Sequence, residues 1–171
     1  MKIRNITISL FILSIVFILS ACKKYDEGPG FSLRTKNARI TGEWKLVEYN
    51  YKKVRGEYFE TETFINDRMS YDNSSSTAGP SHPYARTITL NKDGSYINLI
   101  DEDGTITEIT TYWSWQDGSS SKEHLILNEE AYKIIMLKND ELKLDYIRSG
   151  YENIGGLIVY TIESNYRFIK K

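Results

Sequence analysis

The chain has 171 residues, which is the length of a single domain, and its 22 Lys and Arg residues nearly balance its 23 Asp and Glu residues. This balance gives no basic face of the kind that binds nucleic acid, so we expect no nucleic-acid partner. The single cysteine excludes an internal disulfide framework and any cysteine-based zinc cluster.

The first 21 residues have the pattern of a secretory signal peptide. Lys2 and Arg4 form a basic start, and residues 6–19 carry no charge. At 1.5 Å per residue this run is too short to cross a hydrocarbon core of about 30 Å, whereas it suits the apolar part of a signal peptide. An uncleaved membrane anchor is the alternative, but the small residues at the end of the run favour cleavage.

That run ends in Leu19-Ser20-Ala21-Cys22, which resembles the lipobox of bacterial lipoproteins. The resemblance implies that residues 1–21 are removed, that Cys22 is lipidated, and that acyl chains attach the protein to a membrane. It further implies a place in the cell envelope, at the outer membrane, because Lys23 stands where an inner-membrane retention signal has Asp. Whether the protein faces the periplasm or the cell surface is left open. Residues 22–38 then form the lipidated N-terminus and a flexible tether.

Beyond the tether, the hydrophobic pattern predicts strands. Residues 33–40 could hold one or two helical turns, but from there apolar and polar residues alternate with a period of two. Residues 158, 160, 162, 166 and 168, for example, place Ile, Tyr, Ile, Tyr and Phe on one face. We predict nine strands, in residues 44–51, 57–64, 86–90, 95–100, 105–115, 123–127, 132–137, 141–148 and 158–168.

The connections between these strands predict how they are arranged. Residues 66–84 form one long, linker-like loop, and most of the later connections are short. Short connections favour antiparallel neighbours, and such a meander removes its exposed edges by closing on itself. We therefore expect residues 39–171 to form an all-β, up-and-down antiparallel barrel of eight or nine strands.

The start of the first strand carries a family resemblance. Gly42-x-Trp44 resembles the Gly-x-Trp signature of lipocalins and of lipocalin-like bacterial lipoproteins. In that family the Trp plugs the closed end of the barrel, near an Arg from the last strand. The resemblance implies that Gly42, Trp44 and Arg167 form the barrel base. The alternation of the strand, however, puts Arg167 on the face opposite the apolar one. It could reach the barrel base only at a β-bulge or at the end of the strand.

No pattern in the sequence indicates catalysis. His82 and His124 cannot form a metal triad at a usual spacing, and Asp101, Glu102 and Asp103 fit the solvated charges of a turn. A glycine-rich phosphate loop and a nucleophile elbow are both missing from the sequence. We therefore expect no enzymatic activity, no metal and no cofactor.

Aromatic side chains are the candidate ligand contacts. Trp113 and Trp115 share one strand face, where they line a cavity or, more commonly for such residues, pack in the core. Tyr146 and Tyr160 lie on apolar faces and would add hydroxyl groups to a cavity. We expect a barrel that binds or carries a small, largely apolar ligand such as a fatty acid. The alternative is a filled barrel that serves as a protein–protein interaction module of an outer-membrane complex.

Overall fold

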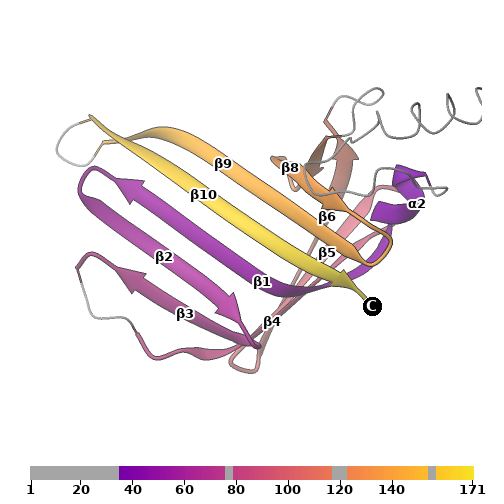
Figure 1. The fold of residues 1–171 in the computed structure, drawn as a ribbon, viewed down its shortest axis with the longest axis horizontal. Helices are drawn as coiled ribbons and strands as arrows, with labels where there is room; N and C mark the ends of the chain where they lie inside the picture. Colours follow the sequence, from indigo (N-terminus) through magenta and orange to yellow (C-terminus); the bar gives the residue numbers. More distant parts are fainter. Residues whose placement is uncertain (1–34, 76–78, 117–122, 154–156) are drawn as a thin grey trace, which may run out of the picture.

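The computed structural model describes residues 35–75, 79–116, 123–153 and 157–171, which contain one short helix and ten strands (Figure 1). Cys22 and the predicted signal peptide lie outside these residues. The elements are α2 (Lys36–Ile40), β1 (Gly42–Arg55), β2 (Tyr58–Ile65), β3 (Arg68–Asn73), β4 (His82–Leu90), β5 (Ser95–Glu102), β6 (Thr105–Trp115), β7 (His124–Leu127), β8 (Glu130–Leu137), β9 (Glu141–Asn153) and β10 (Leu157–Lys170).

The strands form a closed antiparallel barrel in which each strand pairs with the next and β10 returns to β1. The predicted all-β meander barrel is confirmed, but it has ten strands rather than eight or nine. The additional strand is β3, which lies inside residues 66–84, the stretch predicted to be a loop. Asn66 and Asp67 have φ values of 54° and 58°, so they form a tight hairpin turn that joins β2 to β3 without a glycine.

β1 has different partners along its length, and this gives the barrel two unlike ends. Residues 42–45 pair with β4, whereas residues 48–55 pair with β2, and β10 pairs with β1 from Trp44 to Arg55. The β2–β3 hairpin is therefore inserted between β1 and β4 at one end only. It joins β4 through just two residue pairs, Arg68 with Pro83 and Met69 with His82.

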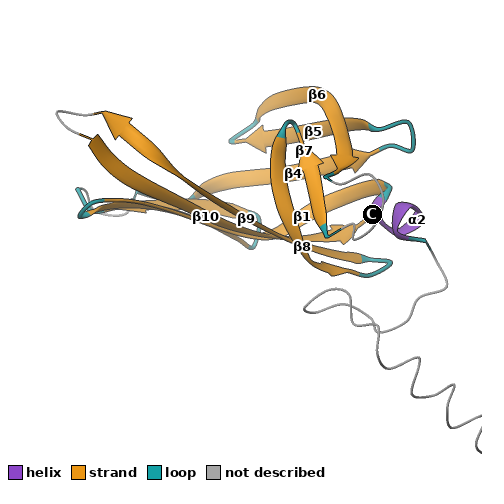
Figure 2. Cartoon of the chain, turned by 90° about the horizontal axis from the view of Figure 1, so that it is seen from above, coloured by secondary structure: helices purple, strands orange, loops and turns teal. Residues whose placement is uncertain are grey.

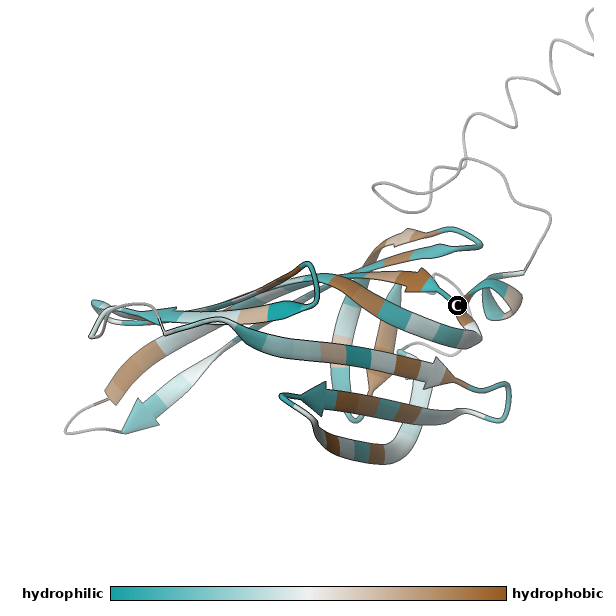
Figure 3. Ribbon diagram, turned by 90° about the horizontal axis from the view of Figure 1, so that it is seen from below, coloured by the Kyte–Doolittle hydropathy of each residue, from teal (hydrophilic) through white to brown (hydrophobic). Residues whose placement is uncertain are grey.

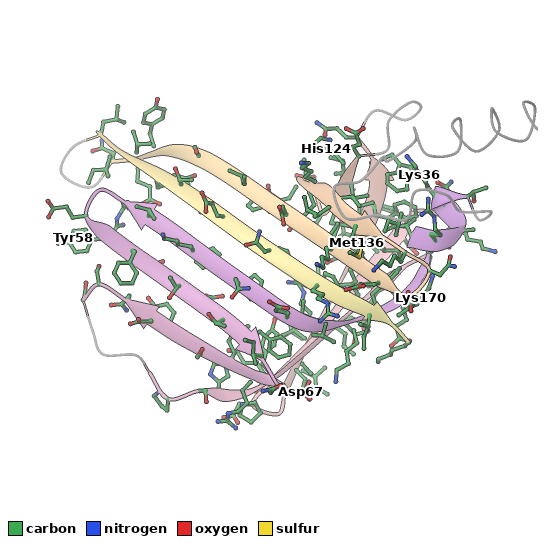
Figure 4. All side chains as sticks on the ribbon, viewed as in Figure 1. Lys36, Tyr58, Asp67, His124, Met136 and Lys170 are labelled. Carbon is green, nitrogen blue, oxygen red and sulfur yellow. The ribbon has the colours of Figure 1, made fainter. Side chains whose placement is uncertain are left out.

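At that end, strands β3, β2, β1, β10 and β9 continue past the barrel as one sheet, which we call the extended sheet (Figures 1 and 2). β8 pairs with β9 only between Leu142 and Asp145. From residue 146 onward, β10 is the only strand that pairs with β9 within the described part of the chain. Tyr58 marks the far end of the extended sheet, and Lys170 lies at the closed end of the barrel (Figure 4).

The hydrophobic core fills the closed end. Apolar and polar residues alternate along the strands, as the colour bands of Figure 3 show. Buried and less buried residues alternate accordingly in β5 and β7, because successive side chains of a strand point to opposite faces. The fully buried large side chains are Ile40, Trp44, Leu46, Phe64, Ile88, Leu90, Leu125, Ile134, Leu137, Leu142, Leu144 and Phe168. An interior packed in this way leaves no channel through the base of the barrel.

Helix α2 covers the base of the barrel. The Thr35 hydroxyl accepts a hydrogen bond from the Ala38 N–H and begins the helix, and the Arg39 guanidinium donates to the Leu137 carbonyl at 2.7 Å. Residues 36–38, which the sequence analysis assigned to the tether, thus belong to this helix. Within the residues described, no helix is long and apolar enough to cross a membrane.

Candidate ligand-binding site

Trp44 plugs the closed end of the barrel, where the Gly-x-Trp resemblance places it. Its side chain is fully buried, and its indole N–H donates to the Ile40 carbonyl at 2.7 Å. The ammonium of Lys170 lies 4.8 Å from the centre of the indole and donates to the Arg39 carbonyl at 2.9 Å. A cation over the indole face stabilises the buried ring.

Gly42 makes room for this lysine. Its φ of 127° is unfavourable for residues with a side chain, and a Cβ atom there would lie 2.7 Å from Lys170 Cε. Both halves of the Gly-x-Trp motif therefore serve one contact: Trp44 provides the indole face, and Gly42 allows the lysine to reach it.

Arg167 does not have the role that the resemblance implied. It lies on the outer face of β10, where its Nε donates to Glu141 Oε1 at 2.8 Å and this bond lowers the pKa of Glu141. The bulge near residue 47 is in β1, so it leaves the alternation of β10 unchanged. Lys170 shares the inward face with Phe168, and the same alternation would have identified it from the sequence.

Trp113 and Trp115 pack at the closed end of the barrel. Their rings meet edge to face at 6.0 Å. The Trp113 N–H donates to the Asn91 carbonyl at 2.8 Å, and the Trp115 N–H donates to Asn37 Oδ1 at 2.9 Å. Trp113 borders a cavity of about 310 Å³ on the outside of the base, beside helix α2. Of the two interpretations of Trp113 and Trp115, cavity lining and core packing, the structure thus supports core packing. Neither ring points into the open mouth of the barrel.

Tyr146 and Tyr160 lie on the inner face of the extended sheet. The Tyr146 hydroxyl donates to Glu130 Oε2 at 2.7 Å. The Tyr160 ring covers Gly150, where its hydroxyl would be 2.6 Å from an added Cβ, and Lys53 Nζ lies 5.2 Å from its centre. Each ring already has neighbours within the sheet, and neither borders the cavity at the mouth of the barrel.

This cavity, of about 370 Å³, opens where the β2–β3 hairpin meets β4 and β5. Its volume lies within the range of small-molecule sites. Five strands contribute its lining, which is aromatic and charged rather than largely apolar. The lining residues are Tyr49, Glu62, Met69, Tyr71, His82, Tyr84, Arg86, Ile100 and Glu102.

Arg86 is the cation of this cavity, and its described partners are neutral. It is half-buried, its Nε donates to Asn98 Oδ1 at 2.8 Å, and its guanidinium lies 5.6 Å from the centre of the Tyr166 ring. Burial acts to lower the pKa of Arg86, but the hydroxyls of Tyr96 and other tyrosines outweigh it and the pKa is raised. The guanidinium therefore stays charged, and no carboxylate pairs with it within the described residues.

The two carboxyl groups in the cavity do not neutralise Arg86. Burial raises the pKa of Glu62, although a hydrogen bond from the Tyr49 hydroxyl at 3.3 Å lowers it in part. Glu102 has a different partner, because its Oε1 lies 2.8 Å from His82 Nε2. Among the described residues, Arg86 is thus a positive charge in a concave site with no carboxylate partner.

Tyrosine rings form the walls around this charge. Tyr49 and Tyr166 lie 4.8 Å apart, and the Tyr84 ring meets Phe64 edge to face at 5.4 Å. Burial raises the pKa of Tyr49 and of Tyr84, so both remain neutral phenols that can donate a hydrogen bond. Such an arrangement can hold an anionic group on Arg86 and a planar or apolar body against the rings.

Arg86 was not among the predicted site residues, although the sequence contains a signal for it. Arg86, Ile88 and Leu90 share one face of their strand, and an arginine on a face that is otherwise buried needs a special partner. Met69 and Tyr71 could not be found in this way, because β3 was not predicted, and the other lining residues come together only when their strands pair. Among the residues that the structure describes, no three His, Cys, Asp or Glu side chains cluster as a metal site.

The comparisons with known proteins place no further constraint on this site. No protein-family model matches the sequence, and no curated protein matches it. A search of solved structures finds the S-type phycobiliprotein lyase CPES from Guillardia theta, with 10% identity over 79% of this chain and 90% of that chain. The TM-score of 0.24 is too low to indicate a common fold, so the lyase's activity is not carried over to this chain.

Proposed function

We propose that this chain is a lipid-anchored envelope protein whose lipocalin-like barrel binds a small molecule at its open mouth. The ligand carries an anionic group that Arg86 binds and an aromatic or apolar body that contacts the tyrosine walls. The observation that carries this proposal is the Arg86 guanidinium, which lies in a cavity of about 370 Å³ without a carboxylate partner in the described chain. A charge-assisted, bidentate contact is what a guanidinium offers to such a ligand.

This ligand class is narrower than the largely apolar one expected from the sequence. The purely apolar interior is the closed end, where side chains fill the space. Space for a ligand remains at the mouth, and there the lining includes Arg86, Glu62 and Glu102. A molecule without a polar group would leave these charged side chains desolvated and unsatisfied, which is unfavourable.

The lipid anchor and the envelope location rest on the sequence of residues 1–34. Support comes from the basic start, the apolar run and the lipobox-like tetrad that ends at Cys22. The absence of enzymatic activity stays a prediction.

Paired probes test the ligand proposal. The protein used is residues 22–171 with Cys22→Ser, which keeps every described contact and lacks the acylation site. It is titrated with 8-anilinonaphthalene-1-sulfonate and with the neutral 1-anilinonaphthalene, which has the same rings but no anionic group. We expect Arg86→Gln to weaken sulfonate binding by about 1.5–3 kcal/mol, about tenfold or more, and to affect the neutral probe much less.

Arg167→Gln is the matched control, because it removes an arginine from the outer face and should change neither affinity. Equal losses for both probes in Arg86→Gln would show that this arginine acts on the fold and not on the anion. If neither probe binds the folded protein, the mouth is not a site for this ligand class.

A further inference from the structure

One edge of the extended sheet has no neighbouring strand among residues 35–75, 79–116, 123–153 and 157–171. β8 leaves β9 after Asp145, while β9 continues to Asn153. Within the described residues, no strand pairs with residues 147–153 on the side away from β10. An edge of this length presents a row of unpaired backbone groups to any strand that approaches it.

The hydrogen bonds at the start of β9 show which residues face this edge. The Glu141 carbonyl accepts from Lys138 N–H, on the β8 side, and the Asp140 carbonyl accepts from Lys170 N–H, on the β10 side. These directions alternate along a strand, and the β9–β10 register has no shift. Ile147, Ser149 and Tyr151 therefore direct their N–H and C=O groups to the open edge.

The opposite edge of the extended sheet is covered by its own chain. The Gly79 N–H donates to the Tyr71 carbonyl of β3 at 3.1 Å, and Arg68 and Met69 of β3 pair with Pro83 and His82 of β4. Residues on the outer edge of β3 therefore already have backbone partners within the described chain. β9 has no such cover in the described chain, so the two edges differ in what they can bind.

Apolar side chains lie beside the open edge on the outer face of the sheet. Ile147 is 71% exposed and Tyr151 is 69% exposed, and Val159, which pairs with Tyr151, is 56% exposed. An open strand edge next to exposed apolar side chains is the usual setting for strand addition.

We propose that β9 pairs antiparallel with β9 of a second copy of this chain, with Ser149 on the two-fold axis. This register makes Ser149 face its own equivalent and places Ile147 opposite Tyr151 on both sides of the axis. Ile147, Ser149 and Tyr151 are the residues whose backbone groups point outward, so all three pairs are hydrogen-bonded pairs. The interface is self-complementary, as a two-fold axis requires.

Charge agrees with this register. On the inner face Arg148 comes to lie opposite Gly150, so like charges do not meet across the axis. Arg148 already donates to Glu130 at 3.1 Å, and Glu152 is bound by Lys53 at 2.7 Å and by Arg55 at 3.2 Å. A shift by two residues would place Ser149 opposite Tyr151 and separate Ile147 from its apolar partner. The sequence therefore favours one register of self-pairing.

Cysteine cross-linking in the full chain tests this arrangement. The chain is produced in a bacterial host, and intact cells are treated with the oxidant copper phenanthroline. Hydrogen-bonded antiparallel partners have Cα atoms about 5.5 Å apart, which a disulfide can span. We expect Ser149→Cys to give a disulfide-linked dimer. Thr161→Cys is the matched control, because it is the β10 partner of Ser149 on the same face, one strand further from the axis.

A second variant tests the same interface without depending on disulfide formation. Ser149→Pro removes an N–H that points to the open edge and leaves the β9–β10 bonds in place. We expect it to convert the dimer of the full chain, measured by light scattering in detergent, to a monomer. If it alters the circular dichroism spectrum, Tyr151→Lys replaces it. A monomeric parent chain, or equal cross-linking at Ser149→Cys and Thr161→Cys, would overturn the proposal.

Discussion

At the scale of single residues, Gly42 shows how a short motif depends on a distant side chain. Lys170 lies 128 positions later in the chain (170 − 42), yet its Cε would be 2.7 Å from a Cβ at Gly42. The positive φ of residue 42 and the close approach of Lys170 each disfavour a side chain there, so the position requires glycine for two independent reasons.

Replacing Gly42 with alanine should therefore destabilise the protein. We expect Gly42→Ala to lower the free energy of unfolding by about 1–3 kcal/mol, from backbone strain and from displacement of Lys170 off the Trp44 ring. The measurement is chemical denaturation followed by circular dichroism. Gly79→Ala is the control and should leave stability nearly unchanged, since Gly79 has no positive φ and, apart from its chain neighbours, no described residue lies within 4 Å of an added Cβ.

Glu62 makes the ligand site sensitive to pH. Burial raises the pKa of Glu62, so the folded state favours its neutral form. Its contribution to stability is present below the pKa of an unfolded glutamate and is lost as the pH rises through the higher folded pKa. The same ionisation places a negative charge in the cavity with Arg86 and opposes an anionic ligand.

Binding of 8-anilinonaphthalene-1-sulfonate should therefore strengthen as the pH falls from about 8 to about 5, where the sulfonate stays ionised. Titrations across this range measure the slope. Glu62→Gln should remove the part of the slope that Glu62 causes. An unchanged slope in Glu62→Gln would contradict this role.

At the scale of elements, the tight turns set the strand count. Asn66-Asp67 and Asn128-Glu129 both have positive φ at two successive residues, which is the geometry of hairpin turns usually formed by Asn-Gly. Because neither contains glycine, the first was hidden inside a predicted loop. The β2–β3 hairpin that it closes supplies three residues of the cavity, namely Glu62, Met69 and Tyr71.

Introducing the usual glycine should stabilise such a turn. Glu129 has φ of 71° between β7 and β8, so Glu129→Gly creates an Asn-Gly pair and relieves strain. We expect the free energy of unfolding to rise by about 0.5–1 kcal/mol, measured by denaturant titration. Ala131→Gly, in the neighbouring strand and without a positive φ, should instead lower it by a similar amount. A destabilised Glu129→Gly would show that the glutamate has another role.

At the scale of the whole molecule, the barrel has a filled end and an open end with separate roles. The filled end holds Trp44, Trp113 and helix α2, and it provides stability. The open end holds Arg86 and continues into the extended sheet (Figure 2). There, within the described residues, one edge of β9 pairs with no other strand after Asp145. Ligand binding and self-association are therefore proposed for surfaces that share a sheet and do not share residues.

Anchoring is tested on the complete chain. We expect Cys22→Ser to abolish acylation and to move the protein from the membrane fraction to the soluble fraction, because two or more acyl chains are needed for stable attachment. Metabolic labelling with a palmitate analogue and fractionation after a carbonate wash measure both effects. The Ser20→Ala variant is the control and should remain acylated. A Cys22→Ser variant that stays with the membranes would contradict the lipid anchor.

The sequence alone determined the fold class and the closed end of the barrel. Period-two alternation depends only on the geometry of a strand, so all-β structure followed directly, and Phe168 and Tyr166 were assigned to one face correctly. The Gly-x-Trp motif likewise marked Trp44, which is fully buried.

Tertiary structure decided what depends on pairing between distant strands. Alternation puts Lys170 on the inward face, but only the packed barrel shows that its ammonium lies over the Trp44 ring and that Trp113 and Trp115 belong to the base. The cavity around Arg86 gathers side chains from five strands, and the open edge of β9 exists because β8 ends its pairing early. Local patterns specify which face a residue occupies. Which residues from other strands share that face depends on register and on where each strand ends, and only the closed barrel establishes both.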